Sequence, residues 1–320
     1  MKINLFTTFA SVRPPFRKHD SRSVRWTNLA RRRPQVLLRI GAVTALAFLS
    51  SCSARADALS LCTPNSAVPE LWIMNAKVAP ALQLGDPGGF QRAVNTSDLF
   101  AFDQPDKTSP IGITVANFES YAEFSQAIVA GTIPPGVHWV MYDNERWQGT
   151  PVNEQEHPAR YEALFARLAH RHGYKVILAP AQNLVFGLSK PGVRPAGAIW
   201  QQYLAFGLAT VSAQSADIYE IQAQADEAAR YRAADVYADF VRAATAQAQA
   251  ANPKITILAG LSTRRVSDAK QLDQDFQSTR SMVAGYWLNV PGWNQADPMT
   301  IAEQFLNGPP STPGCRRASS

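Results

Sequence analysis

Trp139-Val140-Met141-Tyr142-Asp143-Asn144-Glu145-Arg146 is the stretch of this chain that decides the fold. It begins as an apolar strand and ends in two carboxylates. Because side chains alternate between the two faces of a strand, Trp139, Met141, Asp143 and Glu145 would share one face. In a parallel barrel the apolar part of such a face packs the interior, and the acids reach the mouth where substrates bind. This pattern predicts a barrel strand that ends in a polar site.

Strand-like apolar runs alternate with helix-favouring segments over the rest of the chain. We expect strands at Leu71–Asn75, Leu99–Asp103, Ile111–Val115, His138–Glu145, Lys175–Pro180, Asp217–Gln222, Ile255–Gly260 and Gly285–Val290. We expect helices at Pro158–His172, Ala198–Val211, Ala228–Ala251 and Asp268–Val283. This alternation predicts an α/β fold, a single (β/α)8 TIM-type barrel with parallel strands inside and helices outside. The alternative, an open doubly wound sheet, is weakened because no glycine-rich phosphate loop follows the first strand.

The first two βα units are expected to be irregular, because Pro80 and Pro87 interrupt the helix that should follow the first strand. The domain prediction is a leader at residues 1–58, an N-terminal segment at 59–70, the barrel at 71–308 and a loop-like tail at 309–320.

The leader is basic and contains a short apolar run from Ile40 to Leu49, which indicates export. Leu49-Ser50-Ser51-Cys52 fits a lipobox and predicts lipidation of Cys52, whereas small residues from Ala54 to Ala58 would suit an ordinary signal peptidase. A short membrane anchor or a misassigned start is the alternative. The predicted location is therefore extracellular or, as a lipoprotein, in the cell envelope, with membrane contact only through an anchor at Cys52.

The charge of the chain divides at the same boundary. The chain is formally +6, but residues 1–58 hold 11 Lys and Arg against 2 Asp and Glu, so the remainder holds 20 against 23 and is −3. A mildly acidic chain without a basic stripe argues against nucleic-acid binding. We expect a monomer without a cofactor.

The cysteines and histidines add little chemistry. Cys62 and Cys315 are predicted to pair as a disulfide in an oxidising compartment, and two free thiols in the end segments are the alternative. No cysteine lies between them, so a thiol nucleophile is excluded there. His170 and His172 would face different directions on a helix, and we predict no metal site.

Polar residues gather at the predicted strand ends. Glu220, Gln222 and Gln224 occupy one register of the sixth strand, and a buried face of this kind is costly unless it meets water or ligand. Asp226 and Glu227 follow, either as part of the site or, as we favour, as the start of the next helix. The other candidates at strand ends and in loops are Asn75, Asn117, Glu119, Asn144, Trp147, Gln182, Trp287 and Asn289. Acids, amides and tryptophans together are typical of sugar-binding sites.

Two close carboxylates can perform acid–base catalysis, because ionising both is unfavourable and one keeps its proton. Glycoside hydrolysis uses such a pair. We predict Glu145 as the general acid, Asp143 as the orienting group and Glu220 as a further catalytic carboxylate. The structural alternative is that Asp143 pairs with Arg146 and Glu145 caps the following turn.

Asp143-Asn144-Glu145 resembles the end of the fourth-strand motif of family-18 chitinases, Asp-x-x-Asp-x-Asp-x-Glu. That resemblance implies Glu145 as the acid and Asp143 as the group that orients an N-acetyl substituent, although His138 and Met141 replace the two earlier acids. Trp287 resembles the tryptophan at the floor of the chitinase site.

Asn144-Glu145 is also similar to the Asn-Glu pair of the retaining barrel glycosidases. Their nucleophilic Glu on the seventh strand has no counterpart in Gly260-Leu261-Ser262-Thr263-Arg264. The sequence prediction is therefore an exported TIM-barrel glycoside hydrolase acting on a polysaccharide or glycan. A non-catalytic glycan-binding barrel is the main alternative, and a lyase or hydrolase of a non-carbohydrate substrate is the third.

Overall fold

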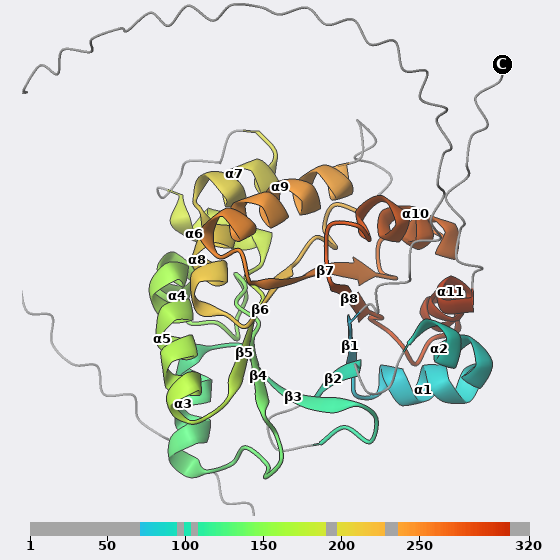
Figure 1. Ribbon diagram of the computed structural model, residues 1–320, viewed down its shortest axis with the longest axis horizontal. Helices are drawn as coiled ribbons and strands as arrows, with labels where there is room; N and C mark the ends of the chain where they lie inside the picture. Colours follow the sequence, from blue (N-terminus) through green and yellow to red (C-terminus); the bar gives the residue numbers. More distant parts are fainter. Residues whose placement is uncertain (1–70, 95–98, 104–107, 190–196, 228–235, 308–320) are drawn as a thin grey trace, which may run out of the picture. The chain divides into compact units, whose positions relative to one another are not determined.

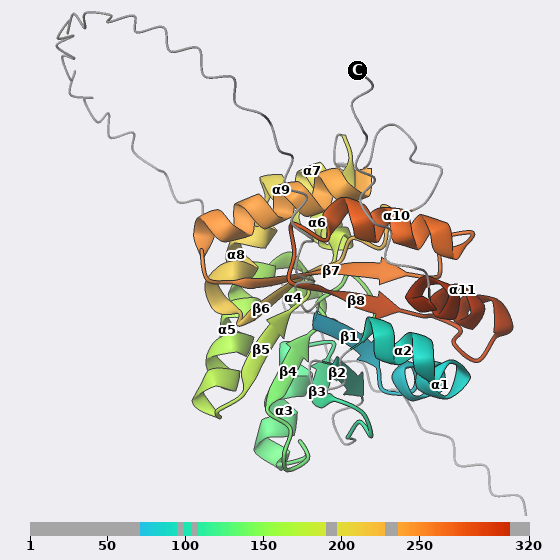
Figure 2. The same cartoon turned by 45° about the vertical axis from the view of Figure 1, so that its right-hand side comes forward.

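The computed structural model describes residues 71–94, 99–103, 108–189, 197–227 and 236–307. Within them the strands form a closed barrel in the order β1-β2-β3-β4-β5-β6-β7-β8, and every neighbouring pair is parallel. Figures 1 and 2 show the strands in the centre and the helices around them. The predicted (β/α)8 barrel is thus confirmed.

The strands are β1 (Leu71–Asn75), β2 (Leu99–Asp103), β3 (Ile113–Phe118), β4 (Trp139–Tyr142), β5 (Lys175–Leu178), β6 (Ile218–Ile221), β7 (Thr256–Ser262) and β8 (Gly285–Asn289). The helices are α1 (Val78–Gly85), α2 (Pro87–Ala93), α3 (Tyr121–Ala130), α4 (Val152–Glu156), α5 (Pro158–Arg171), the short 3-10 helix η1 (Gln182–Leu184), α6 (Val185–Leu188), α7 (Ile199–Ala205), α8 (Leu208–Ser215), α9 (Val236–Ala251), α10 (Ala269–Thr279) and α11 (Ala296–Asn307).

The largest differences from the predicted strands are in β3 and β4. β3 starts two residues later than expected and continues to Phe118, which brings Asn117 into the strand itself. β4 ends at Tyr142 rather than Glu145, so Asp143 and Glu145 lie in the loop that follows it. The backbone N–H of Asp143 still donates to the carbonyl of Phe118 over 2.9 Å, which holds this residue beside the end of β3.

One predicted helix is two. The helix expected at Ala198–Val211 breaks at Gly207, whose φ of 72° is left-handed, and α8 begins directly after it. A glycine adopts this conformation without a steric cost, so the chain can change direction there.

The first βα unit is irregular as predicted. It holds α1 and α2 in place of one helix, and the Asp86 side chain accepts from Gly89 N at the start of α2.

The barrel has an apolar interior and an apolar outer layer. Alternate strand residues pack in the lumen, among them Ile73, Val115, Met141, Ile177 and Leu258. Phe100 and Trp139 meet edge to face at 4.9 Å between ring centroids near the starts of their strands. The opposite faces of the strands pack against the helices. Since apolar side chains fill the lumen toward the strand starts, ligands can enter only from the C-terminal ends.

Residues 1–70 and 308–320 lie outside the described residues, and with them the predicted leader, Cys52, and the Cys62–Cys315 disulfide. No helix in the described ranges has the length and apolar character needed to cross a membrane.

Candidate functional site

Asp143 is at the centre of a carboxylate cluster at the C-terminal end of the barrel. It follows Trp139 and Met141 on the lumen face of β4 and is only 5% exposed. Its Oδ1 accepts from Gln222 Nε2 over 2.6 Å. Burial, and then the charge of Glu145, raise the pKa of Asp143 to about 8, against the hydrogen bonds from Gln222 and Asn117 that lower it. The group therefore changes its protonation state in the neutral range.

Glu145 lies farther out on the same loop and is partly exposed. Asn183 Nδ2 donates to its carboxylate over 3.3 Å, and Asn183 Oδ1 accepts from the backbone of Arg146 over 2.7 Å. Burial raises the pKa of Glu145, the hydrogen bond from Asn183 lowers it, and the charge of Glu119 raises it again. Thr150 fixes the loop, because its hydroxyl donates to the backbone carbonyl of Glu119 over 2.6 Å.

Glu220 is the deepest acid of the cluster. It lies on β6 in the lumen register, between Ile218 and Gln222, and is 0% exposed. Neither of its carboxyl oxygens has a hydrogen-bond partner among the described residues. Burial raises its pKa well above the usual value, and the charges of Asp143 and Glu145 raise it further. Burial of this kind favours the protonated form of a carboxyl group.

A second set of polar groups lies after β5 and β6. Gln182 Nε2 donates to Asp226 over 2.7 Å, and Glu227 accepts from the backbone N–H of Ser262 over 2.7 Å. Burial raises the pKa of Asp226 to about 6, while Gln182 and Arg265 lower it. Asp226 lies in a bend, and Glu227 lies outside regular secondary structure. Residues 228–235 lie outside the described residues, so the helix start at Asp226 and Glu227 stays a prediction.

The structure therefore brings together Asp143, Glu145, Gln222 and Glu220, which the sequence singled out as a site. It also contradicts the predicted alternative in which Asp143 pairs with Arg146. The Asp143 carboxyl is held by Gln222 and Asn117, and the Arg146 guanidinium lies 6.0 Å from the ring centroid of Phe186. Sequence reasoning missed Asn183, whose only signal was its place next to Gln182 after the fifth strand.

The other predicted site residues have local roles. Asn75 is exposed, and its side chain accepts from Lys77 N in the turn before α1. Asn144 is completely buried, and its side-chain amide has no partner among the described residues. Trp147 Nε1 donates to Thr150 Oγ1 over 2.9 Å, which makes this ring part of the loop.

The remaining candidates lie near β7 and β8. The Gln224 amide lies against Gly260, where a Cβ would collide with it. The backbone carbonyl of Asn289 accepts from Thr263 N over 3.1 Å. Trp287 is 6% exposed and packs within the lumen. None of these contacts reaches the carboxyl groups.

The described residues contain no group of three or more His, Cys, Asp and Glu side chains arranged to hold a metal ion. His170 instead contacts Asp217 at 2.9 Å near the start of β6.

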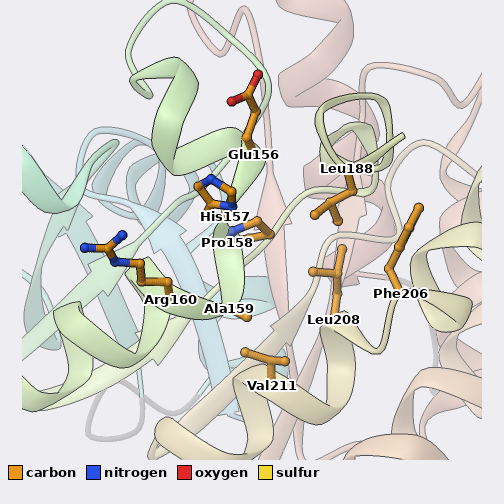
Figure 3. Close-up of a pocket in the computed structure, with 9 residues that line it drawn as sticks. All are labelled: Glu156, His157, Pro158, Ala159, Arg160, Leu188, Phe206, Leu208 and Val211. Atoms are coloured by element: carbon orange, nitrogen blue, oxygen red, sulfur yellow. The ribbon is translucent and has the colours of Figure 1, made fainter. Parts of the chain in front are cut away.

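A pocket of about 320 Å³ lies in the helical layer, away from the carboxylate cluster. Figure 3 shows Leu188, Phe206 and Leu208 on one side of it and Pro158 on the other, while the charged end of Arg160 points away. The other residues that line it are Glu156, His157, Ala159 and Val211. Most of its lining is apolar, and its polar side chains are Glu156, His157 and Arg160.

Comparison with known proteins identifies no family. No protein-family model matches the chain, and no curated protein matches it. Solved structures that match include an archaeal fructose 1,6-bisphosphate aldolase, with a TM-score of 0.41 and 12% identity over 76% of this chain and 96% of that one. A sugar phosphate isomerase/epimerase from Parabacteroides distasonis matches with a TM-score of 0.42 and 9% identity over 78% of this chain and 98% of that one. At such identities the likeness is one of fold.

The predicted function, cleavage or binding of a glycan, is wrong. The matching structures just named are an aldolase and an isomerase/epimerase, not glycosidases. The geometry of the site supplies a physical reason. Trp287, the expected floor for a sugar ring, is enclosed in the lumen, and Asp143 and Glu220 are buried. Carboxyl groups that flank a glycosidic bond must be open to a chain of sugars, and these two are not.

Proposed function

We propose that the protein is an enzyme that transfers a proton to or from a small polar molecule, with Asp143 as the acid–base group. The observation that carries the proposal is the position of this carboxyl. It is enclosed at the C-terminal end of a parallel barrel, and its pKa is raised to about 8. A general base or acid is most effective when its pKa lies near the working pH. Barrel enzymes place their reacting groups at this end of the strands.

The neighbours of Asp143 have distinct parts in the proposal. Gln222 and Asn117 fix the carboxyl by hydrogen bonds, so that it meets a substrate atom in one orientation. Glu220 is the second carboxyl of the site and lies deeper in the lumen, where burial raises its pKa well above the usual value. Glu145, at the partly exposed rim, contacts the substrate through its carboxylate.

The small size of the substrate follows from the enclosure of these groups. Asp143 is 5% exposed and Glu220 is 0% exposed, so a reacting molecule must enter the lumen mouth rather than lie across it. The chemistry available there is proton transfer by carboxyl groups, as in the lyases and isomerases that remove a proton next to an electron-withdrawing group.

The test is deuterium exchange in D2O. The purified protein is incubated with a panel of small hydroxy and amino compounds that carry a carbonyl group, and NMR measures the incorporation of deuterium at carbon. We expect exchange with at least one compound, and a loss of at least about 100-fold in Asp143→Asn. Glu156→Gln, an exposed acid outside the site, is the matched control. If no compound exchanges, or if Asp143→Asn exchanges as fast as the wild type, the proposal is wrong.

We propose as well that the chain is exported, with residues 1–58 as its leader and Cys52 as the residue that receives a lipid. The basic start, the apolar run to Leu49 and the lipobox-like Leu49-Ser50-Ser51-Cys52 support this. Intact-mass analysis of the protein from cells distinguishes the cases. A start at Cys52 with added lipid mass supports a lipoprotein, a start between Ala54 and Leu59 supports secretion, and an unprocessed chain contradicts both.

A further inference from the structure

We propose that the substrate of this site carries a primary ammonium group, which binds between Asn117 and Glu220 next to Asp143. The inference rests on the proposed function, because it names the class of molecule on which the same site acts. Two observations support it. The buried atoms without a hydrogen-bond partner are oxygens, and the charged side chains that act on the site are carboxylates.

Three buried oxygens of Asn117 and Glu220, the residues that interact with Asp143, have no hydrogen-bond partner among the described residues. Both carboxyl oxygens of Glu220 are completely buried and have no partner in the described part of the chain. The side-chain oxygen of Asn117 is also buried and without a partner, while the same side chain donates to Asp143. Buried polar atoms in folded proteins are almost always paired, so these three oxygens call for partners. When Glu220 is ionised, all three are acceptors and need donors. A primary ammonium has three N–H donors and no acceptor.

These acceptors come from elements whose ends surround Asp143. Asn117 is on β3, Asp143 follows β4 and Glu220 is on β6. Asn117 is hydrogen-bonded to Asp143, and among the charges that raise the pKa of Glu220 that of Asp143 has the largest effect. The unpartnered oxygens therefore belong to two residues that both interact with the Asp143 carboxyl.

The charged side chains around the site also favour a cationic ligand. The charged side chains that act on Asp143 and Glu220 are other carboxylates, with Glu145 common to both and Glu119 added for Asp143. No lysine or arginine is among the charged groups that act on these two acids in the described ranges. Arg146 lies over the Phe186 ring, and Arg265 acts on Asp226 in the neighbouring set. An anionic ligand such as a phosphate ester would be repelled, whereas a cation would be bound with the acids ionised.

Binding of a cation therefore displaces protons. Without a ligand the buried acids hold protons, because ionising them together is unfavourable. An ammonium stabilises their ionised forms, so its binding must release on the order of one proton at neutral pH. A neutral alcohol of the same shape has no such effect. This linkage separates an ammonium site from a site that merely accepts small polar molecules.

The experiment compares amines with their hydroxyl counterparts by titration calorimetry on the full protein at about pH 7. The pairs are serinol and glycerol, 1,4-diaminobutane and 1,4-butanediol, and trans-2-aminocyclohexanol and trans-cyclohexane-1,2-diol. Buffers of different ionisation enthalpy report the protons released. We expect at least one amine to bind ten or more times tighter than its counterpart, with release of about one proton. Equal binding within every pair, no binding by any amine, or binding without proton release would overturn the proposal.

Two variants complete the test. Glu220→Gln should weaken the preference for the amine at least tenfold and reduce the proton release, and circular dichroism and thermal unfolding show whether it folds. Asp143→Asn should weaken the amine less and retain part of the proton release, because Glu220 still supplies a carboxyl. Deuterium exchange in the wild type without any preference for amines would leave the proposed function standing and remove this inference. A preference for amines without deuterium exchange would support an ammonium-binding site and remove the proposed proton transfer.

Discussion

Gln222 donates from one side-chain nitrogen to Asp143 Oδ1 over 2.6 Å and to the backbone carbonyl of Ala179 over 2.7 Å. A single amide thus joins the ends of β4, β5 and β6 beneath the mouth of the barrel. It is also the strongest interaction that favours the ionised form of Asp143, in a setting where burial and Glu145 oppose ionisation. The protonation of the site therefore depends on a residue 79 positions away in the sequence.

Gln222→Leu should raise the pKa of Asp143 further above its value of about 8. The hydrogen bond lowers the pKa because it stabilises the carboxylate, so its removal favours the protonated form. We expect an upward shift of about one unit in the titration of the Asp143 carboxyl carbon, followed by NMR in aspartate-labelled protein. Gln224→Leu, on the same face but against Gly260, is the control and should leave the midpoint unchanged. A midpoint that falls in Gln222→Leu would contradict the assignment.

The second prediction concerns Glu162, which lies outside the site. It is completely buried on α5, Ser212 donates to it over 2.7 Å, and burial raises its pKa from 4.5 to about 8. A carboxyl with a raised pKa binds its proton more tightly in the folded chain than in the unfolded one. Its presence therefore costs little stability below about pH 4.5 and progressively more as the pH rises to about 8, above which the cost is constant.

Glu162→Gln removes this dependence. The difference in the free energy of unfolding between variant and wild type should change in favour of the variant by roughly 4 kcal/mol between about pH 5 and about pH 9. Urea unfolding at both pH values measures it, and comparing the two cancels any fixed cost of placing an amide there. Glu156→Gln, on the exposed end of α4, is the control. A difference that does not vary with pH would show that Glu162 ionises as easily in the fold as in the unfolded chain.

The barrel itself could be predicted from the sequence because its strands are continuous apolar runs separated by helix-favouring segments. β1 and β2 have the predicted bounds, since Leu71–Asn75 and Leu99–Asp103 are flanked by polar or turn-forming residues. The position of Gly207 was visible but its conformation was not. A glycine is tolerated in a helix, and only the packing of α7 and α8 required a positive φ there.

The site could be predicted in part for a related reason. Alternation along β4 and β6 placed Asp143 and Glu220 on the lumen face, as the structure has them. The alternation of side chains along a strand does not show how deeply each side chain is buried in the barrel. It does not distinguish a tryptophan that lines an open mouth from one enclosed like Trp287, and this depth decides whether a glycan can reach the acids. Contacts between loops, such as Asn183 with Glu145, depend on the folding of both loops and have no periodic signal.

Gly285→Ala should prevent proper closure of the barrel. Gly285 is the first residue of β8 and pairs with Leu71 of β1. A Cβ at this position would collide with the backbone of Leu71, which cannot move without separating β1 from β8. We expect a loss of at least about 3 kcal/mol in the free energy of unfolding, or an insoluble protein. Gly149→Ala is the control, because its Cβ would meet the end of the flexible Glu119 side chain, and a cost as large there would refute the argument from close backbone approach.

The last prediction concerns Tyr142, whose hydroxyl donates to Glu154 Oε2 over 2.7 Å in the interior. The same carboxylate accepts from the backbone N–H groups of Tyr121 and Ala122, so Glu154 on α4 holds the start of α3 and the end of β4 together. Tyr142→Phe keeps the ring, which stacks on Phe165 at 4.9 Å, and removes only the donor. Because a hydrogen bond to a buried charged group is lost, the free energy of unfolding should fall by about 1.5–3 kcal/mol.

Urea unfolding at neutral pH measures this loss, and Tyr161→Phe serves as the control because its hydroxyl meets Asn153 at an exposed site. The control should change stability by less than about 0.5 kcal/mol. Glu154→Gln and the double variant then give the coupling between the two side chains, which should account for most of the loss in Tyr142→Phe. If the two substitutions are additive, the hydroxyl of Tyr142 stabilises the barrel through some other contact, and Glu154 holds α3 without it.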